Sequence, residues 1–328
     1  MIRYILISFT IFLLTINSLH AQKNYEWSSV KNGEGFNSFL LRNHISPATD
    51  LESFKELNKG RFTKNGNLIA GKRYKIPLRI LTHQVSILGE DHQTVKQMDT
   101  TMNGAVIYLV AGHGGPDPGA VGTIAGHKIT EDEYAYDIVL RMGKELLSHG
   151  AKVHFIIQDP DDGIRDEKYL KPDKDELCYP SQRIPRKHTP RLRQRAAAIN
   201  ILARNEKKST YQRLIILHLD SRGKGNSTDV YFYHHAISRK GKNLALALQQ
   251  KMKDKYDEFQ PNRGYEGTIG TRKLYMLQTT TPPSVFIELG NINNHNDQIR
   301  FLKSENRQAL AMWLSEGIQE NYLLFKKK

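Results

Sequence analysis

A short apolar run that ends in a cluster of glycines constrains this chain more than any other stretch. Residues 105–110 are apolar, and residues 111–120 continue as AGHGGPDPGA. When a buried strand of an α/β protein stops at glycines, the next side chain lies at the edge of the sheet, where ligand sites form. Glycines on both sides of His113 allow a sharp turn and leave room beside the imidazole. Imidazole is the commonest protein ligand for zinc, so His113 is a candidate metal ligand.

Strand-like and helix-like segments alternate along the rest of the chain. Apolar residues recur at helical spacing after the glycine turn, and Gly150 ends that helix. Further helices are expected at 195–207, near 244–256 and at 309–318, and further strands at 151–157, 213–220, 229–233, 274–277 and 284–289. This alternation predicts an α/β domain over residues 104–324, with an open, doubly wound, mostly parallel sheet flanked by helices.

Residues 159–193 interrupt the alternation. They contain five prolines among dense charges and few large apolar side chains, which predicts a surface insertion beside the active cleft, with a helix resuming at Arg195. The single cysteine of the chain, Cys178, lies in this segment. One cysteine excludes an intramolecular disulfide and any metal site built from several cysteines.

The N-terminus and the charge of the chain indicate where it acts. Residues 1–21 combine Arg3, an apolar run and small residues before Gln22, which predicts a signal peptide and an exported protein of the periplasm or cell envelope. An uncleaved N-terminal anchor is the alternative reading, although the run is short for a membrane span. The net charge of +14 and pI near 9.6 favour anionic partners. The chain has no nucleic-acid motif, so a cell-wall polymer is expected and DNA or RNA is not.

Ionisable residues stand where three of the expected strands end. His113, His218 and Glu288 occupy these positions, and Glu131 opens the first helix close to the same crevice. Two histidines, one carboxylate and a water form a recurrent catalytic zinc site, so we expect a single Zn²⁺ held by His113, Glu131 and His218. Such an ion lowers the pKa of its bound water to about 7. The remaining carboxylate, Glu288, is expected to take a proton from that water and pass it to the leaving group.

Four motifs in order give a specific resemblance. The HGGPDPGA stretch from His113, Glu131 with Tyr136 and Asp137 behind it, LHLD ending at Asp220, and VFIELG containing Glu288 resemble the zinc-dependent N-acetylmuramoyl-L-alanine amidases of the Amidase_3 type. The resemblance implies cleavage of peptidoglycan between N-acetylmuramic acid and L-alanine of the stem peptide, with one zinc ion. It also implies that Asp117 and Arg195 support the site. Some members carry an element that an activator protein displaces, so such a partner is conceivable for residues 159–193.

Asp220 departs from this family pattern, which usually has asparagine two residues after the second histidine. The extra carboxylate could orient His218 by accepting its N–H, or could change the electrostatics of the metal. Glu131 also competes with Asp132 and Glu133, since any of the three would be favoured at a helix N-terminus. His218 has the alternative role of a buried core histidine paired with Asp220.

A second, smaller resemblance lies near the N-terminus. After a polar lead-in over residues 22 to 33, two short helices lead to Asn58, then to IAGK at 69–72 and YKIP at 74–77. This pattern resembles a LysM module, a small β-α-α-β fold that binds peptidoglycan, and we assign it to residues 33–78 with a linker at 79–103. The usual opening motif of that family is replaced here. The alternative is therefore a degenerate module that is kept for packing and does not bind glycan. For the whole chain, the alternatives are a non-catalytic wall-binding protein and another zinc peptidase.

Overall fold

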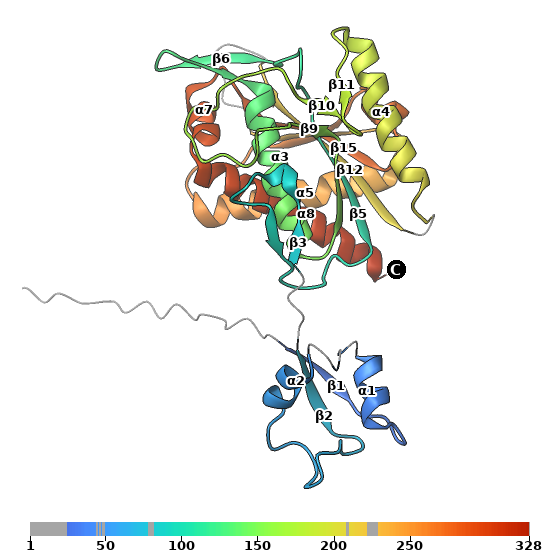
Figure 1. Ribbon diagram of the computed structural model, residues 1–328. Coiled ribbons are helices and arrows are strands. Elements are labelled where there is room, and N and C mark those ends of the chain that lie inside the picture. Colours follow the sequence, from blue (N-terminus) through green and yellow to red (C-terminus); the bar gives the residue numbers. More distant parts are fainter. Residues whose placement is uncertain are drawn as a thin grey trace, which may run out of the picture. The chain divides into compact units, whose positions relative to one another are not determined.

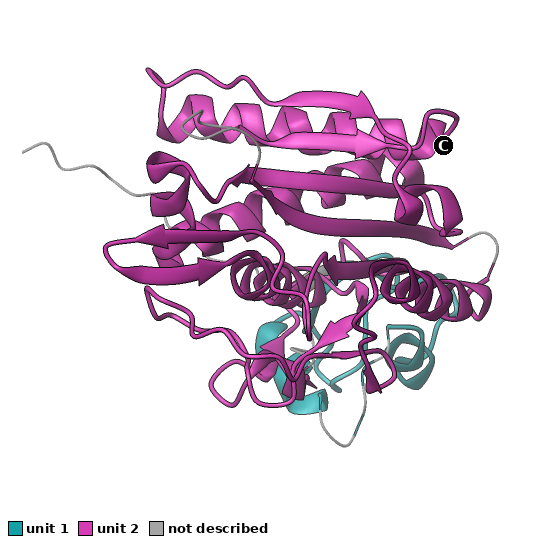
Figure 2. Ribbon diagram, turned by 90° about the horizontal axis from the view of Figure 1, so that it is seen from above, with its two compact units in different colours: residues 1–79 teal, residues 80–328 magenta. Residues whose placement is uncertain are grey.

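The computed structural model of the chain describes residues 25–43, 45, 47, 50–77, 82–207, 210–221 and 229–327. The chain divides into two compact units, residues 1–79 and residues 80–328, which Figure 2 colours separately. The predicted signal segment, residues 1–21, lies outside the described residues. No helix among the described residues is both long enough and apolar enough to cross a membrane.

The first unit has the element order β-α-α-β. It contains β1 (Tyr25–Ser29), α1 (Phe36–Arg42), α2 (Leu51–Leu57) and β2 (Arg73–Pro77), and the two strands pair antiparallel. A core of Phe39, Phe54 and Tyr74 fills the space between them, with ring centroids about 6 Å apart. Asn58 closes the unit, because its side chain donates to Phe54 O and Lys75 O and accepts from Lys75 N.

The expected polar lead-in at residues 22–33 contains strand β1. Its apolar alternation is limited to Tyr25 and Trp27, which is too short to predict a strand, and it pairs with β2, almost fifty residues away in the sequence. Residues 79–103, expected as a linker, also carry structure. They contain β3 (Thr82–Gln84), the 3₁₀ turn η1 (Ser86–Leu88) and β4 (Thr94–Lys96), and Leu88, Val95 and Met102 belong to the core of the second unit.

The second unit is built on a six-stranded sheet with the order β14-β13-β15-β12-β5-β8. Its strands are β5 (Ala105–Ala111), β8 (Lys152–Phe155), β12 (Tyr211–Asp220), β13 (Tyr231–His234), β14 (Thr268–Thr271) and β15 (Ser284–Asn291). Only the β13–β15 pair is antiparallel, so the prediction of a mostly parallel sheet flanked by helices is confirmed (Figure 2). β5 is buried along its whole length, which explains its unbroken apolar sequence.

Helices of the second unit pack around this sheet. Two of them, α3 (Glu131–Ser148) and α5 (Arg239–Phe259), each pack against α8 (Ser304–Lys326). α4 (His188–Arg204) lies apart from this group and contacts α6 (Tyr275–Thr279) and β10 (Figure 1). The remaining elements are β6 (Val121–Ile124), β7 (His127–Thr130), β9 (Ile157–Gln158), β10 (Leu177–Cys178), β11 (Gln182–Arg183) and α7 (His295–Leu302).

Two expected elements are wrong. Residues 274–277 were expected to be a strand and instead lead into helix α6, while the strand of this region is β14, which pairs with β13. A four-residue apolar run fits either a strand or a helix, so its periodicity does not decide. Helix α4 begins at His188 rather than at Arg195. Pro190 suggested that the loop continued, but proline is tolerated in the first turn of a helix.

The 159–193 insertion is partly buried. Leu170, Cys178 and Ile184 belong to the core of the second unit, and Asp159, Glu176 and Arg191 are buried as well. The insertion is held through its backbone: Arg307 donates to the carbonyls of Arg165 and Glu167, and Arg141 donates to the carbonyl of Arg165. Polar contacts therefore fix this segment where apolar side chains are few.

Candidate active site

Three side chains from three elements converge beyond the ends of the parallel strands. His113 follows β5, Glu131 opens α3 and His218 lies near the end of β12, and one ligand atom from each lies within 4.8 Å of the others. β5 and β12 are parallel neighbours with Ala111 opposite Leu217, so both strands end at the same edge of the sheet. Asp132 and Glu133, the competing carboxylates, belong to a different cluster. The structure thus selects Glu131 for this group.

The Glu131 carboxylate is the centre of the group. His218 Nδ1 lies 2.8 Å from its Oε1, and His113 Nε2 lies 3.4 Å from its Oε2. The backbone N–H groups of Leu219 and Ala120 donate to Oε1 and Oε2 at 3.0 and 2.8 Å. Burial would raise the pKa of Glu131, but the hydrogen bond with His218, the charge of His113 and the Ala120 N–H together outweigh it, so the pKa is lowered. An ionised carboxylate therefore faces two imidazole nitrogens.

Asp117 and Arg191 fix the orientation of His113. The Asp117 carboxylate lies 2.9 Å from His113 Nδ1 and also pairs with Arg191 of α4. With Nδ1 engaged, Nε2 is left for the centre of the group. Burial lowers the pKa of His113, but the hydrogen bond to Asp117 and the charge of Glu131 outweigh it and raise the pKa. The predicted supporting role of Asp117 thus has a specific contact.

The His218 ring is held between a glycine and an aromatic ring. On the β15 side it stacks on Phe286, with centroids 4.2 Å apart and an interplanar angle of 17°. On the β5 side, a Cβ atom added to Gly112 would lie only 1.9 Å from His218 Nε2. Burial lowers the pKa of His218 and so favours the neutral imidazole, which is the form that binds metal.

Gly119 makes room in the same way for the other two side chains of the group. A Cβ on Gly119 would lie 2.6 Å from Glu131 Oε2 and 2.7 Å from His113 Cγ, and its φ of +66° is a backbone conformation that favours glycine. Gly112 and Gly119 therefore bring the backbone close to the three side chains of the group without filling their space.

Glu288 lies on β15, the strand beside β12. It is the register partner of His218, and its side chain is 8% exposed. Register partners on parallel strands project to the same face of a sheet, so Glu288 and His218 share a face. Asp220 ends β12 at a shift of register, and its Oδ1 accepts the N–H of Ser221 at 2.7 Å. It is not a member of the three-residue group.

Arg195 is buried on α4 at 2% exposure and donates to the carbonyl of Gly112. Burial lowers its pKa to about 10. Through this bond, α4 holds the end of β5 immediately before His113. Arg195 thus contacts the backbone that carries His113.

The sequence interpretation missed three contacts of the site. Arg191 lies one helical turn before Arg195, and the i, i+4 spacing would have revealed it had α4 been expected to begin at His188. Phe286 lies two residues before Glu288 on the same face, a spacing that the sequence shows. Glu176 Oε2 accepts the N–H of Gly115 at 2.5 Å across 61 residues, and no local pattern predicts that contact.

Comparison with known proteins places this geometry in a family. Residues 107–320 match the family model described as Amidase_3, N-acetylmuramoyl-L-alanine amidase. The germination-specific N-acetylmuramoyl-L-alanine amidase of Bacillus subtilis is 24% identical over 227 residues, which cover 68% of this chain and 82% of that protein.

Solved structures share the fold. The CwlD amidase of Clostridioides difficile, determined in complex with the GerS lipoprotein, is 21% identical with a TM-score of 0.50, and the match covers 67% of this chain and 99% of that one. Cwp6 from Clostridium difficile matches 66% of this chain at 19% identity and a TM-score of 0.49, and the chain spans 29% of its length. The family match extends over most of the second unit and contains His113, Glu131, His218 and Glu288, and the chain therefore belongs to the Amidase_3 family of N-acetylmuramoyl-L-alanine amidases.

Proposed function

We propose that this chain is a zinc-dependent peptidoglycan hydrolase that cleaves the amide between N-acetylmuramic acid and L-alanine of the stem peptide. The observation that carries the proposal is the convergence of His113, Glu131 and His218 within 4.8 Å. Two imidazoles and a carboxylate suit a catalytic zinc ion, which keeps a position open for water or substrate. The close approach of Gly112 and Gly119 leaves space for the ligand side chains, and this supports the same assignment.

Zinc bound by these three residues would polarise the scissile carbonyl and lower the pKa of a coordinated water to about 7. The chain's own groups supply the rest. Asp117 and Arg191 hold the ring of His113, while Gly112 and Phe286 hold the ring of His218. Side chains held in this way keep their orientation during the reaction. Correct orientation contributes large factors to the rate, because a small misplacement of a reacting group slows the reaction strongly.

Glu288 is the proposed general base and acid. The residue is buried, at 8% exposure, and shares a sheet face with His218, one strand away. From this position it would accept a proton from the attacking water and return it to the leaving amine of L-alanine. The amine must leave as a neutral group, so one carboxylate that first accepts and then donates a proton is sufficient for the whole hydrolysis.

The test compares wild type with Glu288→Gln on purified peptidoglycan, with products identified by mass spectrometry. We expect a free lactyl group on N-acetylmuramic acid from wild type, a loss of about 100-fold or more in rate for the variant, and unchanged zinc content. Glu258→Gln, an exposed substitution on α5, is the control. Equal rates for Glu288→Gln and wild type would remove Glu288 from the mechanism. Cleavage inside the stem peptide would identify a different zinc peptidase, and no release at all would indicate a wall-binding protein.

We further propose that the protein is exported and acts on the cell envelope. The features of residues 1–21 and the net charge of +14 support this, because peptidoglycan-associated polymers are anionic. The β-α-α-β order of the first unit supports a LysM-like glycan-binding module, as does the hydrogen bond between the Asn58 side chain and Lys75 of strand β2. A pull-down of residues 25–77 with insoluble peptidoglycan tests this part, and binding no greater than to cellulose would contradict it.

An activator protein is a further proposal for the segment 159–193. The related CwlD amidase has been solved in complex with the GerS lipoprotein. In this chain the segment contacts the glycine turn directly, through Glu176 and Gly115. A partner that moved the segment would therefore move the turn that carries His113.

A further inference from the structure

A cavity lies at the edge of the central sheet that is opposite to the catalytic group. Arg213 is the third residue of β12 and His218 is the eighth, so about 16 Å of strand separates them. Beside Arg213, the first half of α5 and the last turns of α8 border a cavity of about 790 Å³. This volume falls within the range of about 300 to 1,000 Å³ that small-molecule sites occupy. Three basic and three large apolar residues are among those that line it: Arg213, Arg239, Lys240, Leu246, Leu324 and Phe325.

Arg213 is a buried cation without a carboxylate partner. It is 5% exposed and forms no ion pair with any residue that the structure describes. Its Nε donates to Asn321 Oδ1 at 3.2 Å, its Nη1 donates to the carbonyl of Gln212 at 2.8 Å, and its guanidinium lies 4.0 Å from the ring centre of Tyr211. Its Nη2 makes no hydrogen bond within the described part of the chain. A buried charge is costly unless it is paired, so Arg213 offers both a charge and a donor to a ligand in the cavity.

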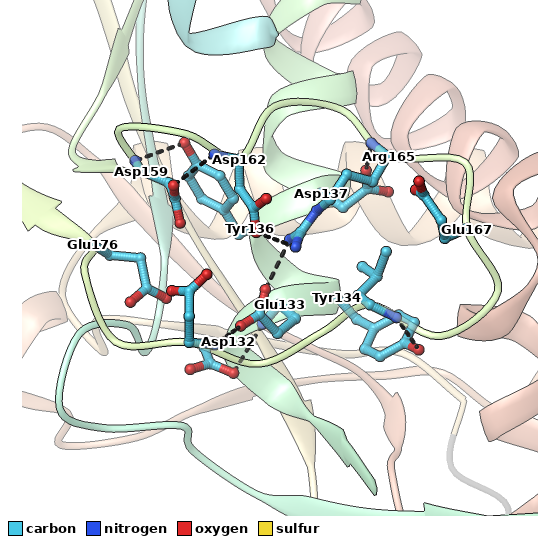
Figure 3. Close-up of polar contacts among 12 residues, drawn as sticks. Asp132, Glu133, Tyr134, Tyr136, Asp137, Asp159, Asp162, Arg165, Glu167 and Glu176 are labelled. Carbon is cyan, nitrogen blue, oxygen red and sulfur yellow. Dashed lines mark hydrogen bonds and ion pairs between the residues drawn. The ribbon is translucent and has the colours of Figure 1, made fainter. Parts of the chain in front are cut away.

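Other arginines of the second unit show how such a charge is ordinarily balanced. The fully buried Arg307 pairs with the carboxylate of Asp137. Figure 3 shows the same arrangement at the partly buried Arg165, whose guanidinium pairs with Glu133 at 2.8 Å. Arg195 also lacks a carboxylate, but it is fixed at the catalytic site by its bond to the end of β5. The arginine of β12 differs from all of these because it lines a cavity and has no carboxylate beside it.

The positive end of α5 adds to the same imbalance of charge. The first turn of this helix contains Arg239, Lys240 and Lys242 and no acidic residue. A helix N-terminus carries a partial positive charge and favours anions, so cations gathered there are unfavourable without a counter-ion. Glu320 also lines the cavity, but its carboxylate pairs with Lys251 at 2.5 Å. Cationic groups from β12 and α5 therefore meet at one cavity whose carboxylate is already engaged.

The rest of the cavity wall is apolar and exposed. Leu246 of α5 is 47% exposed, and Leu324 and Phe325 of α8 are 57% and 37% exposed. Single exposed apolar side chains are ordinary, but a group of them around a hollow indicates a binding surface. A smaller hollow of about 380 Å³ adjoins the cavity, since it shares Arg213, Lys240 and Phe325 with it. A ligand that fits this place therefore needs an apolar body as well as an anionic group.

We propose that this cavity binds an anionic amphiphile, a single alkyl or acyl chain that ends in a carboxylate or a phosphate. The anionic head pairs with Arg213, whose planar guanidinium suits both oxyanions, and with Lys240 at the helix N-terminus. The chain lies along Leu246, Leu324 and Phe325, where burial of its apolar surface favours binding. A simple anion leaves the apolar wall exposed, and a neutral lipid leaves the buried charge unpaired, so neither matches both features.

Calorimetric titration of the full chain with dodecanoate and dodecyl phosphate, below the concentrations at which they form micelles, tests the proposal. We expect one molecule of at least one of them to bind per chain, and the comparison identifies the preferred head. Because α5 and α8 both border the cavity, the ligand should raise Tm by about 5 °C or more once it exceeds its Kd by about 100-fold. Dodecanol, acetate and inorganic phosphate each carry only one of the two features and should bind at least about 10-fold more weakly. Equal binding of any of these three, or no binding of either amphiphile, would overturn the proposal.

Variants then place the ligand in this cavity. Arg213→Gln should weaken binding by about 10-fold or more, Lys240→Gln by about 2 to 5-fold and Leu246→Ser by about 5-fold. Lys253→Gln is the matched control, because it removes the same charge from an exposed position on α5 that does not line the cavity. The two exposed positions, Lys240 and Leu246, carry the test if Arg213→Gln does not fold, as judged by circular dichroism.

Two outcomes with these variants would refute the assignment. An equal loss in Lys253→Gln and Lys240→Gln would show attraction by the basic surface as a whole, without a defined site. Wild-type affinity in both Lys240→Gln and Leu246→Ser would place the amphiphile elsewhere on the chain.

Discussion

Replacing Gly112 with alanine tests whether the space beside His218 is needed for metal binding. The added Cβ would lie 1.9 Å from Nε2, 2.0 Å from Cε1 and 2.4 Å from Cδ2 of His218. Carbon and nitrogen atoms in contact need about 3.5 Å, so the ring must move by roughly 1.5 Å. Phe286 stacks on its other side and restricts that movement. Gly112 does not have a positive φ, so the backbone accepts alanine and the collision with the ring is the main perturbation.

The magnitude follows from the tolerance of a zinc site. Metal–ligand distances are fixed to about 0.2 Å, so a displacement of about 1.5 Å removes His218 from the coordination sphere. We expect zinc affinity to fall by at least about 100-fold, and activity at limiting zinc to fall with it. Competition with a chromophoric chelator measures the affinity. Gly270→Ala is the control, because its Cβ would meet only Tyr233, at an ordinary contact distance of 3.4 Å.

One result would refute the role of His218 as a zinc ligand. If Gly112→Ala binds zinc with wild-type affinity while its circular dichroism and its chelator-treated Tm match those of wild type, the His218 ring is not a ligand in this position. A loss of affinity in both glycine variants would instead point to a general defect in folding.

Three further predictions concern residues around the site and the core. Asp117→Ala should lower zinc affinity by about 10 to 100-fold without changing the fold, because His113 loses the partner of its Nδ1. Isothermal titration measures this affinity, and an unchanged value would contradict the role of Asp117 in orienting His113. Asp137→Asn should lower the free energy of unfolding by about 3 to 5 kcal/mol, because the buried Arg141 and Arg307 both pair with this carboxylate. Urea titration measures this loss, and a loss under about 1 kcal/mol would contradict the prediction. Hydrogen bonds to Glu145 and Asp99 raise the pKa of His149 above 6.5. The stability that protonated His149 gives to the folded chain is therefore complete at lower pH and is lost as pH rises through the raised pKa. His149→Gln should flatten the pH dependence of the free energy of unfolding above pH 6.5, and an unchanged slope would refute this attribution.

The meeting of His113 and His218 at one edge of the sheet was predictable because both residues follow strong local patterns. The run before His113 and the run containing His218 are continuous apolar strands, and parallel neighbours must end at one edge. The position of Glu288 beside His218 was predictable for the same reason, because this carboxylate lies in an apolar strand. Glu131 was preferred over Asp132 and Glu133 only through the family resemblance, because all three acids fit a helix N-terminus. In the structure, the backbone N–H groups of Ala120 and Leu219 donate to Glu131.

The insertion resisted prediction because its contacts are distant in sequence. Glu176 meets Asp132 and Gly115, and Arg307 binds carbonyls some 140 residues earlier, without leaving a periodic signal. Composition indicated a surface loop because the segment is polar. The buried polar contacts that hold it become visible only when the fold brings their partners together, which is also why Arg191 and the true start of α4 were missed.

Anomalous diffraction from zinc-loaded crystals tests the central claim most directly. We predict a single strong zinc peak within about 2.0–2.2 Å of nitrogen atoms of His113 and His218 and an oxygen of Glu131, with a water in the fourth position and Glu288 on the same side. A peak held by other residues, or no peak between these three side chains at saturating zinc, would contradict the account.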